Sequence, residues 1–146
     1  MANVQYNSFK KNVMNGVIGD MSAGGTNIKC MLTTVSYTPD QDTHEFVSSV
    51  TNEVSGAGYT AGGKLLTGKA VSQDNTLNRG KFTAGNVVWN TATITARRAV
   101  FYKDTGTPST SPLISCHDFG SDITSTAGDF TVIVPSDGIA YIGDAA

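Results

Sequence analysis

The sequence predicts a mainly β protein: an antiparallel β-sandwich or barrel with a short N-terminal helix and a second short helix near residues 42–49. Short apolar runs, separated by turn residues, recur about every ten residues between residues 64 and 142, as in antiparallel sheets. Charged residues make up only 15% of the chain, while Ser, Thr, Asn and Gly are abundant, which is typical of a β protein with a weakly charged surface. At 146 residues the chain fits a single domain, 1–146, with one hydrophobic core.

An N-terminal helix is predicted over residues 4–16, because apolar residues recur there at spacings of three and four. These residues are Tyr6, Phe9, Val13 and Val17. Asn3 could cap the helix, and Gly16, with apolar residues beyond it, fits a glycine stop in the left-handed conformation. Such a short helix is marginal alone, so its apolar stripe must dock on the β-core or on a neighbouring subunit.

A central strand is predicted over residues 27–36, where both faces carry apolar side chains. One face has Ile28, Cys30 and Leu32, and the other has Met31 and Val35. Pro39 ends this segment, because proline cannot donate to a strand ladder. The second short helix is predicted over residues 42–49, where Asp42 and Glu45 have the spacing of a capping box.

Antiparallel strands are predicted throughout residues 64–142. Their ranges are 64–67, 69–73, 80–84, 86–89, 91–97, 100–103, 113–119, 130–134 and 139–142. Turns are predicted at 74–75, 84–86, 104–106, 120–122 and 135–138, where Gly, Asn, Asp and Pro supply the geometry that reverses a chain. The predicted core comprises Phe82, Trp89, Phe101, Phe119, Phe130 and Ile133, since large apolar side chains dominate core energetics. Residues 105–111 are predicted to form an exposed loop that could touch a partner.

A glycine-rich stretch, residues 51–68, marks the change from partly helical to strand-like sequence. Within it, Gly58-x-x-x-x-Gly63-Lys64 has the spacing of a phosphate-binding P-loop. However, Leu65 stands where a P-loop needs Ser or Thr to hold magnesium, and a strand pattern follows where a helix is required. We therefore interpret this stretch as a turn whose positive-φ glycines lead into a strand.

A metal site is a second candidate, at residues 40–45. The possible ligands are Asp40, Asp42, His44 and Glu45. Acidic residues in a first helical turn favour the positive end of the helix dipole, and the spacing lacks the glycine turn of a calcium loop. The structural interpretation is therefore preferred, and no metal or other cofactor is expected.

Catalytic motifs are absent from the sequence, so an enzyme is not expected. The two cysteines, Cys30 and Cys116, fall in apolar strand candidates and are predicted to be buried thiols. Cys116 and His117 are neighbours on one predicted strand, so their side chains should point to opposite faces. This argues against a Cys–His couple.

The net charge is −2, so no basic excess is present to neutralise phosphates, and nucleic-acid binding is not expected. The pairs Lys10-Lys11 and Arg97-Arg98 are interpreted as solvated faces. Nowhere do 18 apolar residues run together, so no membrane span is expected. Synthesis in the cytoplasm is the corresponding expectation for localisation.

Several blocks, spread in order over nearly the whole chain, carry a family resemblance. They are Tyr6-x-x-Phe9-Lys10-Lys11, Tyr37-Thr38-Pro39-Asp40, His44-Glu45-Phe46, residues 51–63, Val88-Trp89, Tyr102-Lys103-Asp104-Thr105-Gly106 and Gly128-Asp129-Phe130-Thr131. Together they resemble a family of small virion structural proteins of tailed bacteriophages, usually labelled capsid decoration, cement or head-fibre proteins. The most specific block is residues 52–63.

The resemblance implies a non-enzymatic capsid decoration (cement) protein that binds the outer surface of the mature head and bridges capsomers. Its partners would be the major capsid protein and further copies of itself. A trimer would match the three-fold positions of a capsid lattice, and many weak contacts would suffice through avidity. The family supplies no motif for capsid-contact residues.

Two other functions are kept as alternatives. A tail component or fibre-type adhesin would contact the host surface and would need exposed Trp89, Tyr59 and Tyr102 as stacking platforms for sugars. A cytosolic enzyme or nucleotide-binding protein would depend on the segment from Gly58 to Lys64.

Overall fold

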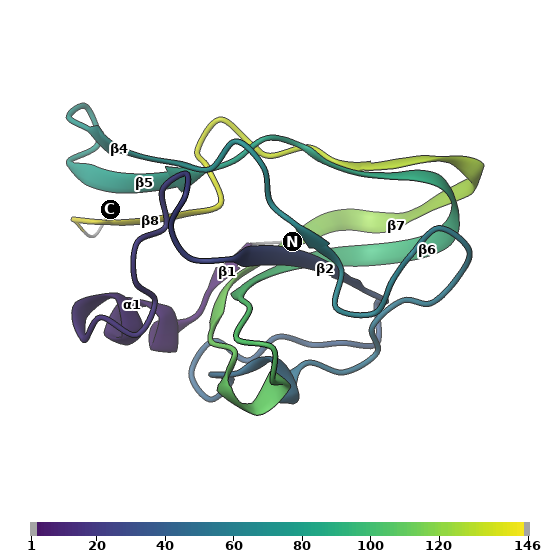
Figure 1. Cartoon of the computed structure of the whole chain (residues 1–146), viewed down its shortest axis with the longest axis horizontal. Helices are drawn as coiled ribbons and strands as arrows, with labels where there is room; N and C mark the ends of the chain where they lie inside the picture. Colours follow the sequence, from purple (N-terminus) through teal and green to yellow (C-terminus); the bar gives the residue numbers. More distant parts are fainter. Residues whose placement is uncertain (1–2, 145–146) are drawn as a thin grey trace.

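Two antiparallel β-sheets form the body of the protein in the computed structural model, which describes residues 3–144 (Figure 1). The larger sheet has the strand order β1-β7-β6-β2-β3, and the smaller sheet has the order β4-β5-β8. Neither sheet closes on itself, so the molecule is sandwich-like and not a barrel. The prediction of a mainly β fold is therefore confirmed.

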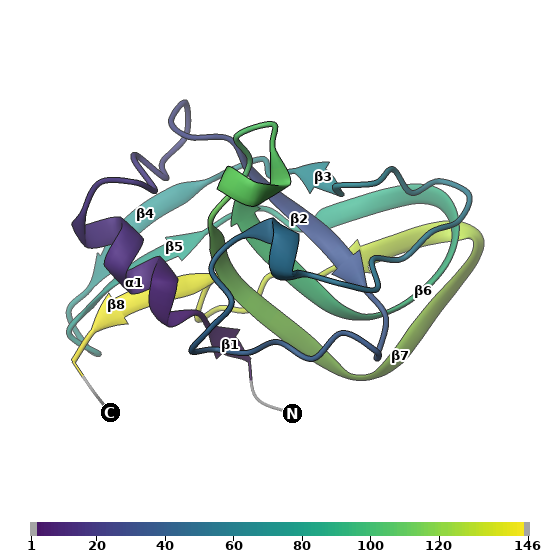
Figure 2. The ribbon, with the colours of Figure 1, turned by 90° about the horizontal axis from the view of Figure 1, so that it is seen from below.

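The elements have the following bounds. The larger sheet contains β1 (Val4–Gln5), β2 (Ile28–Thr33), β3 (Lys64–Leu65), β6 (Val87–Lys103) and β7 (Leu113–Val132), and the smaller contains β4 (Ala70–Asp74), β5 (Arg79–Thr83) and β8 (Ala140–Gly143). One helix, α1 (Asn7–Met14), and two 3₁₀ turns, η1 (Val47–Ser49) and η2 (Pro108–Thr110), complete the described part. Figure 2 shows α1 lying across the smaller sheet. Within residues 3–144 no helix is both long and apolar enough to cross a membrane.

The long hairpin of β6 and β7 replaces five separately predicted strands. The predicted turn at residues 120–122 is wrong, because the chain continues through it as part of β7. Ala96 and Arg98 of β6 pair with Ile123 and Asp118 of β7, so the residues between these partners form a bulge. Gly120, at a φ of 86°, supplies the left-handed residue, and its N–H donates to Asp118 Oδ1 at 2.7 Å. A left-handed glycine serves a G1-type bulge as well as a turn.

The predicted core is mostly confirmed. Four aromatic side chains are buried, namely Phe82, Trp89, Phe101 and Phe130, and Phe119 is half-buried against them. The prediction for Ile133 is wrong, because its side chain is 74% exposed. It follows the last residue of β7, Val132, which is buried, and successive strand side chains point to opposite faces.

The N-terminal helix is shorter than the predicted 4–16. Val4 and Gln5 form β1 and pair with Cys116 and Ser115 of β7. Asn3 does not cap the helix, because its Oδ1 accepts from the N–H of Asp118 at 3.2 Å. The glycine stop is confirmed.

Two residues beyond Met14, the last residue of α1, Gly16 adopts a φ of 80°. The N–H of Gly16 donates to the Val13 carbonyl at 3.3 Å, and Ile18 beyond it is fully buried. Gly16 therefore directs the chain so that an apolar side chain reaches the core.

The second short helix lies where predicted but is reduced to the 3₁₀ turn η1. Before it, Asp40 Oδ1 accepts from the N–H groups of Asp42 and Thr43 at 2.9 and 3.1 Å, which is an alternative to helical bonding. Phe46 then forms a β-bridge with Pro112. The central strand 27–36 likewise ends early, at Thr33.

Candidate functional site

The glycine-rich stretch crosses β2 and β6 with its backbone almost touching theirs. A Cβ at Gly63 would collide with the carbonyl of Cys30, and one at Gly56 would collide with the carbonyl of Thr93. Gly58 has a φ of 80°, and a Cβ there would stand 2.8 Å from the Cα of Ala92. Lys64, the residue at the P-loop lysine position, donates its ammonium to the Val88 carbonyl. These glycines are therefore explained by close backbone packing, and β3 follows them, as predicted.

Glu53 holds this stretch together from within. Its Oε1 accepts from the Tyr59 hydroxyl at 2.7 Å and from the Gly62 N–H at 2.6 Å. The Tyr59 hydroxyl also accepts from the N–H of Leu32 in β2 at 3.0 Å, and the Tyr102 hydroxyl donates to the Gly62 carbonyl at 2.5 Å. Burial raises the pKa of Tyr59 far above its ordinary value. These bonds bind the glycine-rich stretch to the larger sheet.

The aromatic residues considered as a sugar platform lie largely inside the protein. Trp89 is 4% exposed and Tyr102 is 3% exposed, while Tyr59 is half-buried against the core. The Trp89 ring lies 5.7 Å from the Tyr59 ring and 6.3 Å from the Phe130 ring, measured between centroids. These distances are typical of packed aromatic clusters. Trp89 therefore acts as a packing anchor.

The acidic segment, residues 40–45, is a loop that binds α1 through two of its acidic side chains. Asp42 accepts from the side-chain amide of Asn7 at 2.8 Å, and Glu45 forms an ion pair with Lys11 at 2.6 Å. His44 Nδ1 lies 3.0 Å from the Tyr37 hydroxyl. Among residues 3–144 no three His, Cys, Asp or Glu side chains are grouped so that they could hold a metal ion.

A buried chain of polar groups continues from His44. Its members are Tyr37, whose hydroxyl lies 2.8 Å from that of Tyr6, and Arg98, which donates to the carbonyl of Tyr37 at 2.6 Å. Burial raises the pKa of Tyr37 to about 12, so its hydroxyl keeps its proton and serves as a hydrogen-bonding group. The chain ties residues 35–44 to the β6–β7 hairpin.

Asp118 is the acidic centre of this region. Its two oxygens pair with Arg97 at 2.8 Å and Arg98 at 3.0 Å. Burial opposes its ionisation, but the hydrogen bond from Arg97 and the Gly120 N–H hold its pKa below the ordinary value. The expectation that Arg97 and Arg98 form a solvated face is therefore wrong. Both pair with one carboxylate, and Arg97 is half-buried while Arg98 is buried.

The two thiols are buried and free, as predicted. Cys30 pairs with Phe101 in the ladder, whereas Cys116 pairs with Val100. Neighbouring residues of a strand point to opposite faces, so the thiols lie on opposite sides of the larger sheet and cannot form a disulfide. Burial raises the pKa of Cys116 to about 12, which keeps it protonated and unreactive.

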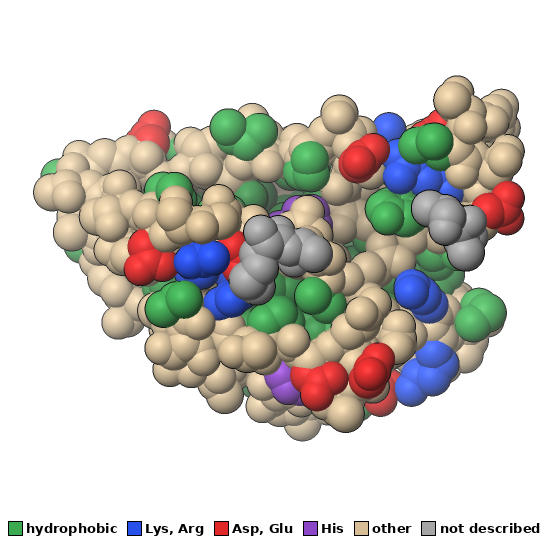
Figure 3. Space-filling view, turned by 180° about the vertical axis from the view of Figure 1, so that it is seen from behind, with side chains coloured by type: hydrophobic (Ala, Val, Ile, Leu, Met, Phe, Trp, Pro, Cys, Tyr) green, Lys and Arg blue, Asp and Glu red, His purple; other side chains and the backbone are tan. Residues whose placement is uncertain are grey.

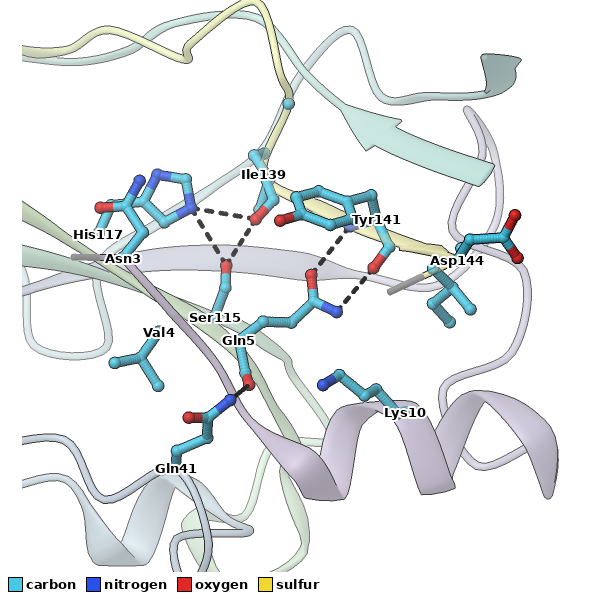
Figure 4. Close-up of a pocket in the computed structure, with 13 residues that line it drawn as sticks. Asn3, Val4, Gln5, Lys10, Gln41, Ser115, His117, Ile139, Tyr141 and Asp144 are labelled. Atoms are coloured by element: carbon cyan, nitrogen blue, oxygen red, sulfur yellow. Dashed lines mark hydrogen bonds between the residues drawn. The ribbon is translucent and has the colours of Figure 1, made fainter. Parts of the chain in front are cut away.

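A polar cleft of about 460 Å³ opens between β1 and β7 of the larger sheet and β8 of the smaller one (Figure 4). Ser115 and His117 point into it from β7, where they are two positions apart and share a face. The Ser115 hydroxyl donates to the Ile139 carbonyl at 2.9 Å, and His117 Nε2 lies 3.0 Å from the same oxygen. Nε2 must therefore carry a proton and donate it to that carbonyl.

This tautomer decides what the Ser115–His117 pair can do. The Ser115 oxygen lies 3.4 Å from His117 Nε2, but a protonated nitrogen cannot accept the serine proton, so the pair is not a nucleophile with its base. Burial lowers the pKa of His117, which keeps the ring neutral. As predicted, the His117 ring and the Cys116 thiol point to opposite faces. Both Ser115 and His117 instead fasten Ile139, next to β8, to the larger sheet.

Gln5 makes a second tie across the cleft. Its side-chain amide accepts from the N–H of Tyr141 at 2.9 Å and donates to the carbonyl of Tyr141 at 2.7 Å. Figure 4 shows this pair of bonds beside Lys10, at the rim of the cleft. The amide of Gln5 thus occupies the place of a neighbouring strand along the outer edge of β8.

An apolar groove of about 210 Å³ lies on the other side of β8, between α1 and the smaller sheet. It is lined mainly by Phe9, Val13, Met21, Val71, Phe82 and Ile142. The apolar stripe of α1 therefore docks on the β-core, but it does not cover Val71, which remains 55% exposed. On the face drawn in Figure 3, positive and negative side chains are interspersed without a continuous basic stripe.

No protein-family model, curated protein or solved structure matches the chain. Its function is therefore inferred from the geometry of the described residues and from the resemblance noted in the sequence.

Proposed function

We propose that this chain is a non-enzymatic virion structural protein of a tailed bacteriophage, a capsid decoration (cement) protein that binds the outer surface of the mature head and bridges neighbouring capsomers. The observation that carries the proposal concerns residues 52–63, the most specific block of the resemblance. Here Glu53 bonds Tyr59 and Gly62, and the glycines fit against β2 and β6. Glu53 and the glycines are thus needed together for this packing, which supports the use of the block as the main basis of the resemblance.

The use of the titratable side chains also supports a binding role over a catalytic one. Glu45 pairs with Lys11, and Asp118 pairs with two arginines. His117 and Ser115 share one carbonyl oxygen. Each of these groups stabilises a contact between segments distant in sequence, and none presents a nucleophile next to a free base.

The exposed surface suits many weak, repeated contacts. Single apolar side chains protrude from a weakly charged background, and the most exposed are Met14, Ile133, Val71 and Leu77. One such contact is weak, but a bound protein that bridges capsomers adds a contact at each repeat of the shell, so avidity supplies the stabilisation. In this proposal the partners are the major capsid protein and other copies of the chain, and neither nucleic acid nor a membrane takes part.

The alternative of a tail component or fibre-type adhesin has less support. It needs aromatic rings on the surface, and Trp89 and Tyr102 are buried. Tyr141 is 48% exposed, but the Arg79 guanidinium lies over its ring, 4.6 Å from the centroid, so capsid decoration remains the proposal.

Co-sedimentation tests the proposal. Purified protein is mixed with expanded capsids of the encoding phage that lack it, and with unexpanded procapsids as the control. We expect saturable binding to the expanded capsids and a higher temperature of capsid disruption once the sites are filled. Absence of binding to expanded capsids, together with absence of the chain from purified virions by mass spectrometry, would refute the proposal.

A further inference from the structure

The borders of the two sheets differ in how they are protected against the addition of another strand. β1 and β3, at the borders of the larger sheet, contain only two residues each. The part of β7 that β1 does not cover is interrupted by the bulge at Gly120 and by Ala127, which has a φ of 46°. The outer edge of β8 is bonded by Gln5. Short strands, bulges and covering groups are the usual protections of an edge.

β4 lacks every one of these protections. It runs for five residues in regular register with β5, from Ala70 opposite Thr83 to Asp74 opposite Arg79. It contains neither lysine nor proline, and four of its five residues are exposed. Figure 1 shows β4 at the outer border of the smaller sheet, with no element beyond it.

The hydrogen bonds of β5 determine which groups of β4 face outward. The carbonyl of Phe82 accepts from the N–H of Ile139 at 2.8 Å, so the main chain of Phe82 faces β8. Val71 lies opposite Phe82, and antiparallel pairs alternate between bonded and non-bonded. The N–H and C=O of Val71, and those of Gln73 two residues on, therefore point to the open edge. Outside the strand ladders, none of these four groups takes part in a backbone hydrogen bond among residues 3–144.

We infer that β4 is the docking edge for a second copy of this chain. Two β4 strands pair antiparallel about a two-fold axis at Ser72, which joins the two smaller sheets into one of six strands. Val71 of each copy then exchanges both main-chain hydrogen bonds with Gln73 of the other. All four outward groups of each strand are satisfied, and Ser72 faces Ser72 of the second copy in a non-bonded pair.

The arrangement of the outward groups favours an antiparallel second copy. Val71 and Gln73 lie one position before and one position after Ser72, so a two-fold rotation at Ser72 places Val71 of one copy opposite Gln73 of the other. The charged side chains at the two ends take no part, because Asp74 pairs with Arg79 at 3.1 Å and Lys69 donates to the Thr26 carbonyl within the same copy. The main-chain groups of the strand are thus complementary to themselves, which is the requirement of a two-fold interface.

Apolar surface adds to the same interface. The two-fold axis is perpendicular to the joined sheet, so the face that carries α1 lies on the same side of the sheet in both copies. The apolar groove between α1 and the smaller sheet of one copy therefore adjoins the same groove of the other. Val71, 55% exposed in one copy, would stand beside Gln73 and diagonally opposite Val71 of the second copy. This burial adds hydrophobic stabilisation to the main-chain bonds.

The interface is independent of capsid binding, so purified protein tests it alone. It predicts a two-fold dimer, whereas the resemblance to capsid proteins favours a trimer. If the protein is a monomer in solution and still binds capsids, this interface is contradicted and the proposed function is not. If it is a dimer that never binds capsids, the proposed function is contradicted and the interface is not.

Disulfide trapping tests the register. In the predicted pair the two Ser72 Cα atoms are about 4.5 Å apart, within the range of a disulfide, so Ser72→Cys should form a covalent dimer under mild oxidation. Val71→Cys and Gln73→Cys are matched controls, because like residues there are diagonal neighbours about 7–8 Å apart and should remain largely uncrosslinked. Equal trapping at all three positions, or none at Ser72→Cys, would overturn the register.

Analytical ultracentrifugation tests the edge itself. The Gln73 N–H faces outward, so Gln73→Pro removes a donor from the interface without removing a bond to β5. We expect a dimer for the wild type and for the control Gln73→Ala, and a monomer with an unchanged circular dichroism spectrum for Gln73→Pro. Wild-type protein that is monomeric at every concentration, or Gln73→Pro that stays as dimeric as Gln73→Ala, would overturn the inference.

Discussion

The side-chain amide of Gln5 bonds both the N–H and the C=O of Tyr141, at 2.9 and 2.7 Å. The two residues lie at opposite ends of the described chain, and through them the segment before α1 completes the edge of β8. One glutamine side chain thus links the two sheets and closes a strand border.

Gln5→Ala should lower the free energy of unfolding by about 1–2 kcal/mol, since two hydrogen bonds of ordinary strength are lost. Gln5→Glu keeps an acceptor for the Tyr141 N–H but places a second acceptor oxygen against the Tyr141 carbonyl, so its loss should be at least as large. Urea denaturation measures both. Equal stability of Gln5→Ala and the wild type would show that the amide does not fasten β8.

Gly63→Ala should destabilise the protein by more than about 3 kcal/mol, in the range reached only by severe steric or core defects. Gly63 has a φ of 80°, and an added Cβ would collide with the carbonyl of Cys30. Gly106→Ala is the matched control, because its φ is 87° and no atom stands within 4 Å of the added Cβ.

The control should lose only about 1–2 kcal/mol, the cost of a left-handed alanine. Thermal unfolding of both variants gives the comparison. Similar losses at the two positions would contradict the close approach of the glycine-rich stretch to β2.

Trp89 should emit blue-shifted fluorescence that iodide hardly quenches, because its ring is 4% exposed and packed between Tyr59 and Phe130. The same titration after unfolding in guanidinium supplies the fully accessible reference. Red-shifted, readily quenched emission from the native protein would place the ring on the surface and would revive the sugar-binding adhesin.

Asp118 should contribute stability that is lost in acid. Its folded pKa lies below the ordinary value of 3.8, so its contribution is present above that pH and disappears as the pH falls through the folded pKa. Asp118→Asn should therefore be less stable than the wild type at neutral pH, because two arginines lose their partner, and should show a smaller loss on acidification.

Unfolding free energies at neutral and acidic pH test this expectation. Asp122→Asn, an exposed change on the same strand, is the control and should follow the wild type. If Asp118→Asn has the same acid dependence as that control, the ion pairs with Arg97 and Arg98 do not stabilise the fold.

The sequence predicted the class of fold and most of the core, because period-two patterning and large aromatic residues report burial directly. It did not separate a turn from a bulge at Gly120, since a left-handed glycine serves both a turn and a G1-type bulge. The helix predicted at 42–49 is reduced to η1, because Phe46 forms a β-bridge with Pro112 and Asp40 accepts from the N–H groups of Asp42 and Thr43. A bridge to a segment so distant in sequence leaves no mark in a local pattern.

The site shows the same limit. Ser115 and His117 lie two positions apart on a predicted strand, so the sequence predicts that they share a face. It does not predict their common partner, the Ile139 carbonyl. Similarly, the glycines of residues 51–68 predicted positive φ values, but their closeness to β2 and β6 depends on how the sheet is assembled.

Electron cryo-microscopy of the phage particle that carries this chain tests the central claim most directly. We predict density for two open antiparallel sheets on the outer surface of the mature head, in contact with at least two neighbouring capsomers. Density confined to the tail, or a particle without the chain, would contradict the assignment as a capsid decoration protein.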